Sequence, residues 1–144
     1  MAAAEAKKKA DDVLVVQDFW DVPVSGVATF EGAFHSFKRI YDEAAQGWSK
    51  SNEFMLQPLG GADLAAFNEI DAILKDWRAG YDAGKPDLHP QLPEATGVKA
   101  DRYKELYRKI DAILHTETPR TVRCVGKMTP VPGETRYVVE WIRT

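Results

Sequence analysis

The chain has 144 residues, a formal net charge of −3 and an apolar share of 44%. This length fits one domain with its own core, because single cores are commonly built from about 100–200 residues. No stretch approaches the roughly 18 consecutive apolar residues of a membrane-spanning helix, which excludes that class of protein. The single cysteine, Cys124, excludes an internal disulfide framework and favours a reducing compartment.

The first twelve residues, MAAAEAKKKADD, form a polar leader. They contain three lysines with no apolar run behind them, and a secretory signal needs such a run. We therefore predict a flexible leader over residues 1–12, a single domain over residues 13–144 and a cytoplasmic location.

Strand patterns come next in the chain. Residues 13–16 are aliphatic and mostly β-branched, which predicts a short strand, and Pro23 is expected to break its continuation. Residues 24–30 and 33–41 flank a Glu31-Gly32 turn signal and predict a hairpin. Residues 42–52 are polar and predict a loop, and residues 53–59 predict a further strand.

A helix is predicted over residues 63–81. Its apolar residues recur at spacings of three and four, which places them on one continuous stripe. Asp63 follows two glycines and is expected to be the N-cap, while Gly80 and Gly84 supply the end of the helix. The stripe consists of Leu64, Phe67, Ile70, Ile73, Leu74, Trp77 and Tyr81.

A second helix is predicted over residues 100–115, where His115 complements the carbonyl end of the dipole. Between the helices, residues 82–99 contain too many prolines and glycines for a regular element. The pentapeptide IDAIL occurs in both helices and places Ile70 and Ile110 on the buried stripes, with Asp71 and Asp111 outside. Shared packing requirements explain the repeat better than a duplicated unit does.

Two strands are predicted at the end of the chain, over residues 120–128 and 135–143. In the first, Cys124 shares a face with apolar residues, which predicts a buried structural thiol. In the second, Val138 and Ile142 lie opposite another apolar face, which predicts that the strand is covered on both sides.

The order of these elements predicts an α+β fold. The sheet is mainly antiparallel, with about four N-terminal and two C-terminal strands, and the two helices pack on one face of it. Strands grouped before and after a helix pair disfavour the regular alternation of a parallel sheet.

Signals for chemistry are few. No histidine, cysteine or carboxylate spacing matches a metal site, and no phosphate-binding or dinucleotide-binding glycine motif is present, so no metal, cofactor or catalytic residue is predicted. His35 is interpreted as an exposed strand residue, and Cys124 as structural. Asp18 and Asp21 have no recognisable partner in the sequence.

The candidate binding residues are large or apolar side chains in irregular, polar stretches. Trp20 and Trp48 are interpreted either as anchors for a partner or as lids on the core. Leu88, His89 and Leu92 lie in the break over residues 82–99, and long connections of this kind tend to be functional or disordered. This break could pack on its own domain or bind a partner.

Two classes of function follow. The first is a small cytosolic, non-catalytic binding protein of the inhibitor, immunity or adaptor type, with another protein as partner and a homo-oligomer as an open alternative. The second is a small-molecule enzyme whose site is assembled from His35, His89, Asp18 and Asp21. Residues 10–98 contain 15 acidic and 6 basic residues, and residues 99–144 contain 6 acidic and 10 basic residues. An acidic protein repels phosphate unless its basic residues form a concentrated patch, and the sequence shows none. Nucleic acid is therefore not an expected partner.

Overall fold

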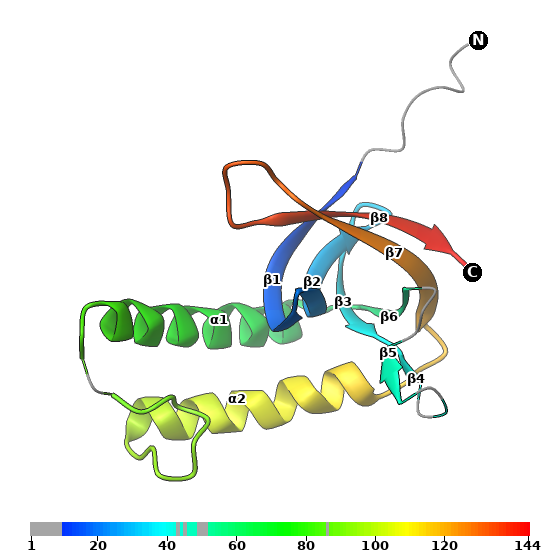
Figure 1. The fold of residues 1–144 in the computed structure, drawn as a ribbon. Coiled ribbons are helices and arrows are strands. Elements are labelled where there is room, and N and C mark those ends of the chain that lie inside the picture. Colours follow the sequence, from blue (N-terminus) through cyan, green and yellow to red (C-terminus); the bar gives the residue numbers. More distant parts are fainter. Residues whose placement is uncertain (1–9, 43, 45, 49–51, 86) are drawn as a thin grey trace. The chain divides into compact units, whose positions relative to one another are not determined.

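The computed structural model describes residues 10–42, 44, 46–48, 52–85 and 87–144 (Figure 1). The chain forms two compact units, one from the residues up to Pro58 together with Glu117–Thr144, the other from Leu59–Thr116. Most of the predicted leader lies outside the described residues. The organisation of the chain as a single domain stays a prediction.

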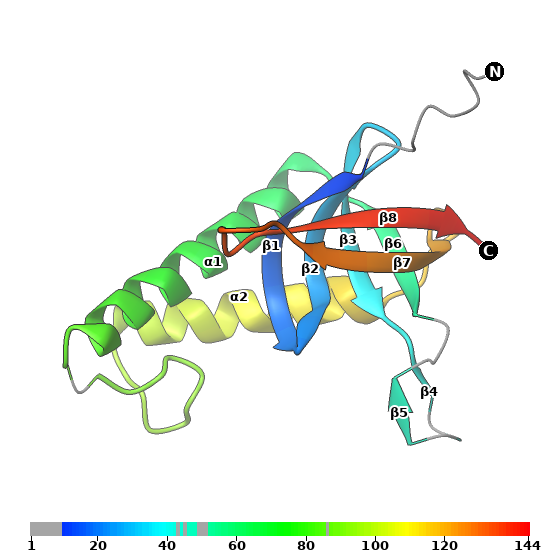
Figure 2. The same cartoon turned by 45° about the horizontal axis from the view of Figure 1, so that its top comes forward.

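The first unit is a closed antiparallel barrel. Its strand order is β1-β2-β3-β6-β7-β8, and the pairing of β1 with β8 closes it, which can be followed in Figures 1 and 2. The predicted α+β class and the antiparallel sheet of four strands followed by two are confirmed. Closure into a barrel was not predicted, and the packing of the helices on one face of the sheet stays a prediction. The six strands are β1 (Asp11–Trp20), β2 (Val22–Phe30), β3 (Ala33–Arg39), β6 (Glu53–Pro58), β7 (Val122–Pro130) and β8 (Tyr137–Arg143).

The predicted hairpin is the β2–β3 pair. Its two turn residues, Glu31 and Gly32, have φ angles of 50° and 77°. Two consecutive positive φ angles characterise the type I′ turn, whose twist matches that of the flanking strands. The ladder then runs from Phe30 opposite Ala33 along both strands. The predicted loop over residues 42–52 also contains a short ladder, between β4 (Tyr41–Asp42) and β5 (Gly47–Trp48).

Pro23 does not break the sheet, so that prediction is wrong. It is fully buried within β2 and lies opposite Phe19 of β1. The register between β1 and β2 shifts at Asp18 and Phe19, and proline is tolerated in a sheet at such irregularities. The first strand accordingly continues to Trp20 instead of ending near Val16.

The barrel interior is filled by aromatic rings. The rings of Phe37, Phe54 and Trp141 lie within 5.3–5.9 Å of one another, measured between centroids. The Trp141 indole N–H donates a 3.1 Å hydrogen bond to the carbonyl of Thr29, so its one polar atom is satisfied. Cys124 is a buried free thiol in the same cluster, as predicted.

The last strand, β8, was predicted to be covered on both faces, and this is wrong for its outer face. Val139 and Trp141 point into the barrel, whereas Ile142 is exposed. The strand is interior in another sense, because it pairs with β7 on one edge and with β1 on the other. An apolar residue on the second face therefore does not require a second covering layer.

The second unit is a helical hairpin of α1 (Gly61–Asp82) and α2 (Val98–His115). Both predicted helices are confirmed, each extending about two residues further toward its N-terminus. Asp63 is not the N-cap: Gly60 holds that position, and the Leu64 N–H bonds to the Gly60 carbonyl at 3.0 Å. Asp63 lies in the first turn, where its charge complements the helix dipole.

The C-terminus of α1 ends in a Schellman motif, in agreement with the predicted role of the glycines. Gly84 has a φ of 84°, a conformation that glycine adopts without strain. Its N–H bonds to the Tyr81 carbonyl at 3.0 Å, and the Lys85 N–H bonds to the Gly80 carbonyl at 2.9 Å. The last turn of the helix is thus satisfied by the start of the following loop.

The two IDAIL copies bury their first isoleucines as predicted, but only Asp111 lies outside, since the Asp71 side chain is 20% exposed. Ile70 and Ile110 are almost completely buried. The Asp71 carboxylate pairs with the Lys75 ammonium at 2.8 Å, one turn along α1. Asp111 is exposed and lies within 3.2 Å of His115 in the last turn of α2, where the His115 ring also contacts the Asp111 carbonyl.

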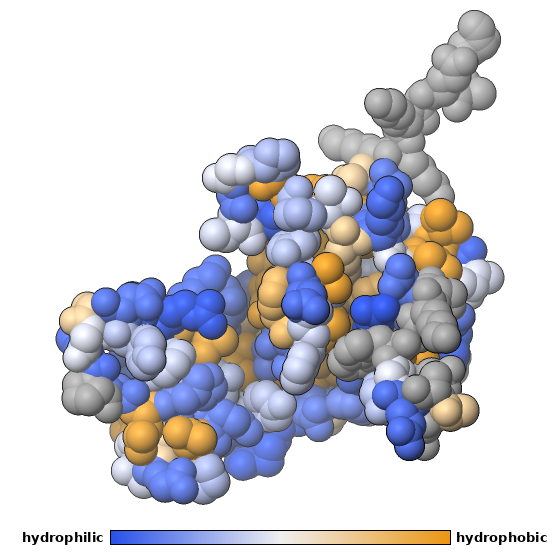
Figure 3. Space-filling view, in the orientation of Figure 1, coloured by the Kyte–Doolittle hydropathy of each residue, from blue (hydrophilic) through white to orange (hydrophobic). Residues whose placement is uncertain are grey.

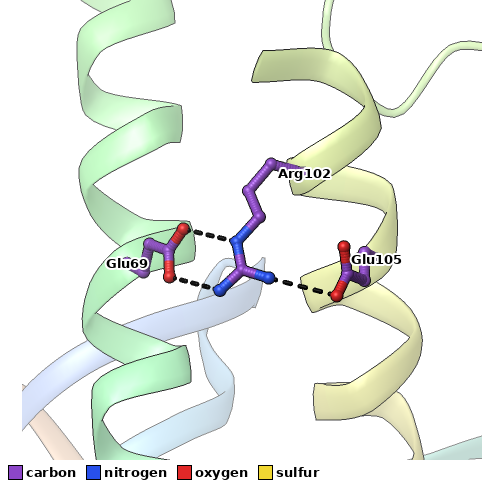
Figure 4. Close-up of polar contacts among 3 residues, drawn as sticks. All are labelled: Glu69, Arg102 and Glu105. Atoms are coloured by element: carbon purple, nitrogen blue, oxygen red, sulfur yellow. Dashed lines mark hydrogen bonds and ion pairs between the residues drawn. The ribbon is translucent and has the colours of Figure 1, made fainter. Parts of the chain in front are cut away.

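Ion pairs link the two helices and show that they run antiparallel. Arg102 of α2 donates two hydrogen bonds to Glu69 of α1, at 2.6 and 2.7 Å, and a third to Glu105 at 3.1 Å (Figure 4). These bonds lower the pKa of Glu69 and raise the pKa of Arg102. Toward the start of α1, Asp63 lies 4.0 Å from Lys109 near the end of α2.

Among the residues that the structure describes, no helix is long and apolar enough to cross a membrane.

Candidate functional site

In the connection between α1 and α2, the described residues 83–85 and 87–97 form a loop that contacts both helices. On the α1 side, the Trp77 indole N–H donates a 3.1 Å hydrogen bond to the Asp87 carbonyl. On the α2 side, the Lys104 ammonium donates a 2.6 Å hydrogen bond to the Ala95 carbonyl. Pro90 and Ala95 are buried. The sequence left open whether this segment packs on its own domain, and within the helical unit it does.

His89 lies at the centre of this loop, between the helices. Its ring is 4.7 Å from the Trp77 ring of α1 and 5.7 Å from the Tyr103 ring of α2, both in edge contacts. Its Nδ1 accepts a 3.1 Å hydrogen bond from the Gln91 N–H. Burial lowers the pKa of His89, and the positive charge of Arg78 lowers it further.

The backbone of the loop is folded into consecutive turns. The Leu92 N–H bonds to the His89 carbonyl, and the Ala95 N–H bonds to the Leu92 carbonyl, each at 3.0 Å. These bonds fix the segment that carries the predicted binding residues. Leu88, His89 and Leu92 therefore lie on one folded loop, with the histidine half-buried and both leucines partly exposed.

The two leucines are both partly exposed on the loop surface. Leu88 is 51% exposed and Leu92 is 42% exposed. Figure 3 shows apolar surface over the loop between α1 and α2. We call Leu88 and Leu92 the leucine pair.

A cavity of about 730 Å³ opens beside the loop, within the helical unit. Trp77, Leu88 and Pro90 contribute large apolar side chains to its wall. Its volume lies within the range of about 300–1,000 Å³ that is common for small-molecule sites. The complete lining is Ile73, Asp76, Trp77, Ala79, Gly80, Ala83, Lys85, Asp87, Leu88, Pro90, Glu94, Ala95, Thr96, Lys99 and Ala100.

An ion pair across the helices contributes to the polar lining of the cavity. The Lys99 ammonium of α2 lies 2.7 Å from the Asp76 carboxylate of α1. Their hydrogen bond lowers the pKa of Asp76 and raises the pKa of Lys99. Both side chains are exposed, so this pair adds little to stability.

The two predicted tryptophan sites lie in the barrel unit. Trp20 is 68% exposed at the end of β1, and its neighbour Phe19 is also exposed. Trp20 thus belongs to a strand, where it pairs with Val22, although the register of β1 is irregular just before it. Trp48 belongs to β5 through its backbone pairing with Tyr41. Its side chain lies outside the described part of the structure.

His35 was interpreted as an exposed strand residue, and this is wrong. It is only 7% exposed, its ring makes an edge contact with Phe30, and its Nδ1 lies 3.0 Å from the Ala33 carbonyl. His35 lies two residues before the fully buried Phe37, so both side chains belong to the same, buried face of β3. Asp18 also has a structural partner, since it accepts a 3.0 Å hydrogen bond from the Ser25 hydroxyl.

Asp21 forms the tight turn between β1 and β2 with a φ of 64°. Aspartate tolerates this left-handed conformation better than most residues do. The position therefore has a structural explanation. Within the described residues, no cluster of three or more histidine, cysteine, aspartate or glutamate side chains could hold a metal ion.

Sequence reasoning missed the residues that anchor the loop. Trp77 was assigned to the core stripe of α1, yet it is half-buried and donates to the loop backbone. Tyr103 and Lys104 were predicted as part of the second helix, and their contacts with the loop were not predicted. The available signal was a tryptophan near the end of α1 and a histidine with no explanation in the following loop.

No protein-family model, curated protein or solved structure matches this chain. Any functional assignment therefore rests on the geometry of the loop, the leucine pair and the cavity.

Proposed function

We propose that this chain is a non-catalytic cytosolic binding protein of the inhibitor, immunity or adaptor type, and that its partner is another protein. The leucine pair, Leu88 and Leu92, is the proposed contact surface. The observation that supports this most directly is that the loop is fixed by its own unit while both leucines remain exposed.

Fixing a loop before binding matters for affinity. Each side chain or segment that is ordered on association reduces the free energy of binding, and a loop that is already ordered avoids most of this loss. Burying an aliphatic side chain fully is worth about 1.5–3 kcal/mol. Two partly exposed leucines on a fixed loop therefore provide a compact apolar anchor for a protein surface.

Trp20 is a second proposed contact, in the barrel unit. Tryptophan is enriched among the residues that dominate protein interfaces, and this one is largely exposed. Trp48 stays a prediction. A second copy of the chain remains the alternative partner, and light scattering across a concentration series distinguishes it from a different protein.

The double variant Leu88→Ser, Leu92→Ser tests the proposed surface. We expect its free energy of unfolding to change by about 0.5 kcal/mol or less, because substitutions of exposed side chains rarely cost more. We expect a partner captured from the native host by the unaltered chain to bind the variant at least about tenfold more weakly, the effect of losing roughly 1.4 kcal/mol. Quantitative capture and thermal unfolding give the two readouts.

The matched control is Val98→Ser, which removes an 89% exposed apolar side chain at the start of α2. Binding should survive this change. His89→Ser provides the opposite control, because it removes the ring between Trp77 and Tyr103 and should lower the melting temperature. Equal capture by the unaltered chain and the double leucine variant would contradict the proposal.

The alternative function is a small-molecule enzyme, and the cavity is the observation that favours it. The histidines and aspartates first considered for that role include His35 and Asp18, which have the structural contacts described above. Saturable shifts of the Trp77 indole N–H resonance by members of a small-molecule fragment library would favour this alternative. Such binding should be insensitive to Leu92→Ser, since Leu92 is not part of the cavity lining.

A further inference from the structure

Three elements of the helical unit meet at His89. Its ring contacts Trp77 of α1 and Tyr103 of α2, and its Nδ1 receives the Gln91 N–H of the loop. No other histidine of this unit is placed in this way, since His115 is exposed in the last turn of α2. A change in the protonation of the His89 ring would therefore affect the contacts that hold the loop against both helices.

The contact with Gln91 fixes the protonation state of the ring. A backbone N–H can only donate, so Nδ1 must carry a free electron pair, and the proton of the neutral ring lies on Nε2. An imidazolium carries protons on both nitrogens and cannot accept this hydrogen bond. Protonation would leave the Gln91 N–H facing a second donor.

The electrostatic surroundings of the ring act in the same direction. The charged group of α1 that acts on His89 is the Arg78 guanidinium. On the α2 side, the His89 ring contacts the phenol ring of Tyr103. Burial lowers the pKa of His89, and the charge of Arg78 lowers it further. A lowered pKa means that the packed loop binds a proton less tightly than the opened loop does.

We propose that His89 is a pH-dependent latch that holds residues 87–95 against the helices when it is neutral and releases them when Nδ1 is protonated. If the loop binds a partner as proposed above, the latch also controls binding, because only the packed loop presents Leu88 and Leu92. This consequence rests on the proposed function. The latch itself is a property of the loop and does not depend on any partner.

The direction of the pH dependence follows from linkage. A histidine whose pKa is lowered in the packed state stabilises that state fully above its ordinary pKa of about 6.5. As the pH falls below that value, the opened loop takes up a proton more readily, and the equilibrium for opening increases by up to about tenfold per pH unit. The dependence levels off below the pKa of the packed state.

Amide hydrogen exchange of the full chain, followed by NMR, tests the latch without a partner. The reporters are the amides of Gln91, Leu92 and Ala95, which donate the hydrogen bonds of the loop. After correction for intrinsic exchange, we expect their protection to fall by up to about tenfold per pH unit below about pH 6.5. A side-chain titration of His89 should show a pKa below its ordinary value.

Two variants separate the latch from other pH effects. His89→Phe keeps an aromatic ring between Trp77 and Tyr103 but cannot be protonated, so the protection of the Leu92 and Ala95 amides should become independent of pH. His115→Gln removes the exposed histidine of α2 and should leave the pH dependence unchanged.

Either of two results would overturn the latch: an ordinary or raised pKa for His89, or a pH dependence that persists in His89→Phe. These outcomes are distinct from failure of the proposed function. Loss of the latch leaves the leucine pair as a contact surface, and failure to capture a partner leaves the exchange results unaffected.

Discussion

Gly26→Ala is expected to prevent the barrel from closing. Gly26 lies opposite Val16 in the β1–β2 ladder and has a φ of 155°. A Cβ atom at this position would lie 1.9 Å from the carbonyl oxygen of Val15 and 2.9 Å from its carbonyl carbon. Both are backbone atoms of a paired strand, so no side-chain rotation relieves the clash. We expect a loss of more than about 4 kcal/mol, in the range reserved for severe local disruption.

The measurement is thermal unfolding followed by near-ultraviolet circular dichroism, which reports the fixed environment of Trp141 in the barrel. Gly32→Ala is the matched control, because Gly32 also has a positive φ but a Cβ there would meet no atom within 4 Å. Its cost should be limited to backbone strain of about 1–2 kcal/mol. A melting temperature close to that of the unaltered chain for Gly26→Ala would show that the β1–β2 ladder is not as the structure describes it.

Ile70→Ala and Ile110→Ala should each lower the free energy of unfolding by about 2–5 kcal/mol. Both side chains are almost completely buried, and truncating a buried isoleucine removes its burial energy and leaves a cavity. Urea unfolding followed by circular dichroism measures the loss. The two residues occupy the same place in the two IDAIL copies, so their losses should be similar.

Asp111→Ala is the control for the second copy. The Asp111 side chain is exposed, and its contact with His115 at the end of α2 is worth little. We expect a change of about 0.5 kcal/mol or less. Asp71→Ala is a less clean comparison, because the Asp71 carboxylate is more shielded beside Lys75. Equal losses for Ile110→Ala and Asp111→Ala would mean that the pentapeptide repeats for a reason other than packing.

The spacing of apolar residues predicted the helices and strands, because that spacing records which face of each element is buried. Apolar spacings of three and four located both helices, and the turn signal at Glu31-Gly32 located the β2–β3 hairpin. Closure of the sheet could not be predicted in this way. It depends on pairing between Asp11 and Val139, at opposite ends of the chain, and no local pattern encodes that pairing.

The errors at single residues also have physical causes. Asp63 has a good capping side chain, but Gly60 and Gly61 allow the helix to begin earlier. His35 was placed on the exposed face of its strand, but it shares a face with the buried Phe37, and its ring contacts Phe30 across the turn. Pro23 is tolerated because the neighbouring strand is irregular at that point.

The candidate site was predicted only in outline. The break between the helices was identified as the segment of interest, and it carries Leu88, His89 and Leu92. Its anchoring could not be predicted, because the contacts of His89 with Trp77 and Tyr103 depend on the distance between two helices. Sequence spacing gives the face of each helix but not that distance.

The antiparallel helix pair has a consequence for the order of folding. β6 and β7 are neighbours in the barrel, with Phe54 opposite Cys124, yet the whole helical hairpin separates them in the chain. Joining the ends of a long unfolded segment costs entropy that rises with its length. The Asp63–Lys109 contact brings the start of α1 and the end of α2 to the same end of the hairpin.

A hairpin that folds first would therefore shorten the segment that the β6–β7 ladder has to close, and would act as the nucleus for the barrel. Ile110→Ala should then slow refolding, measured by stopped-flow fluorescence, and not only accelerate unfolding. An unchanged refolding rate would mean that the strands pair before the helices form. In the expected order, the rate at which the barrel closes is set by a segment that contributes no strand to it.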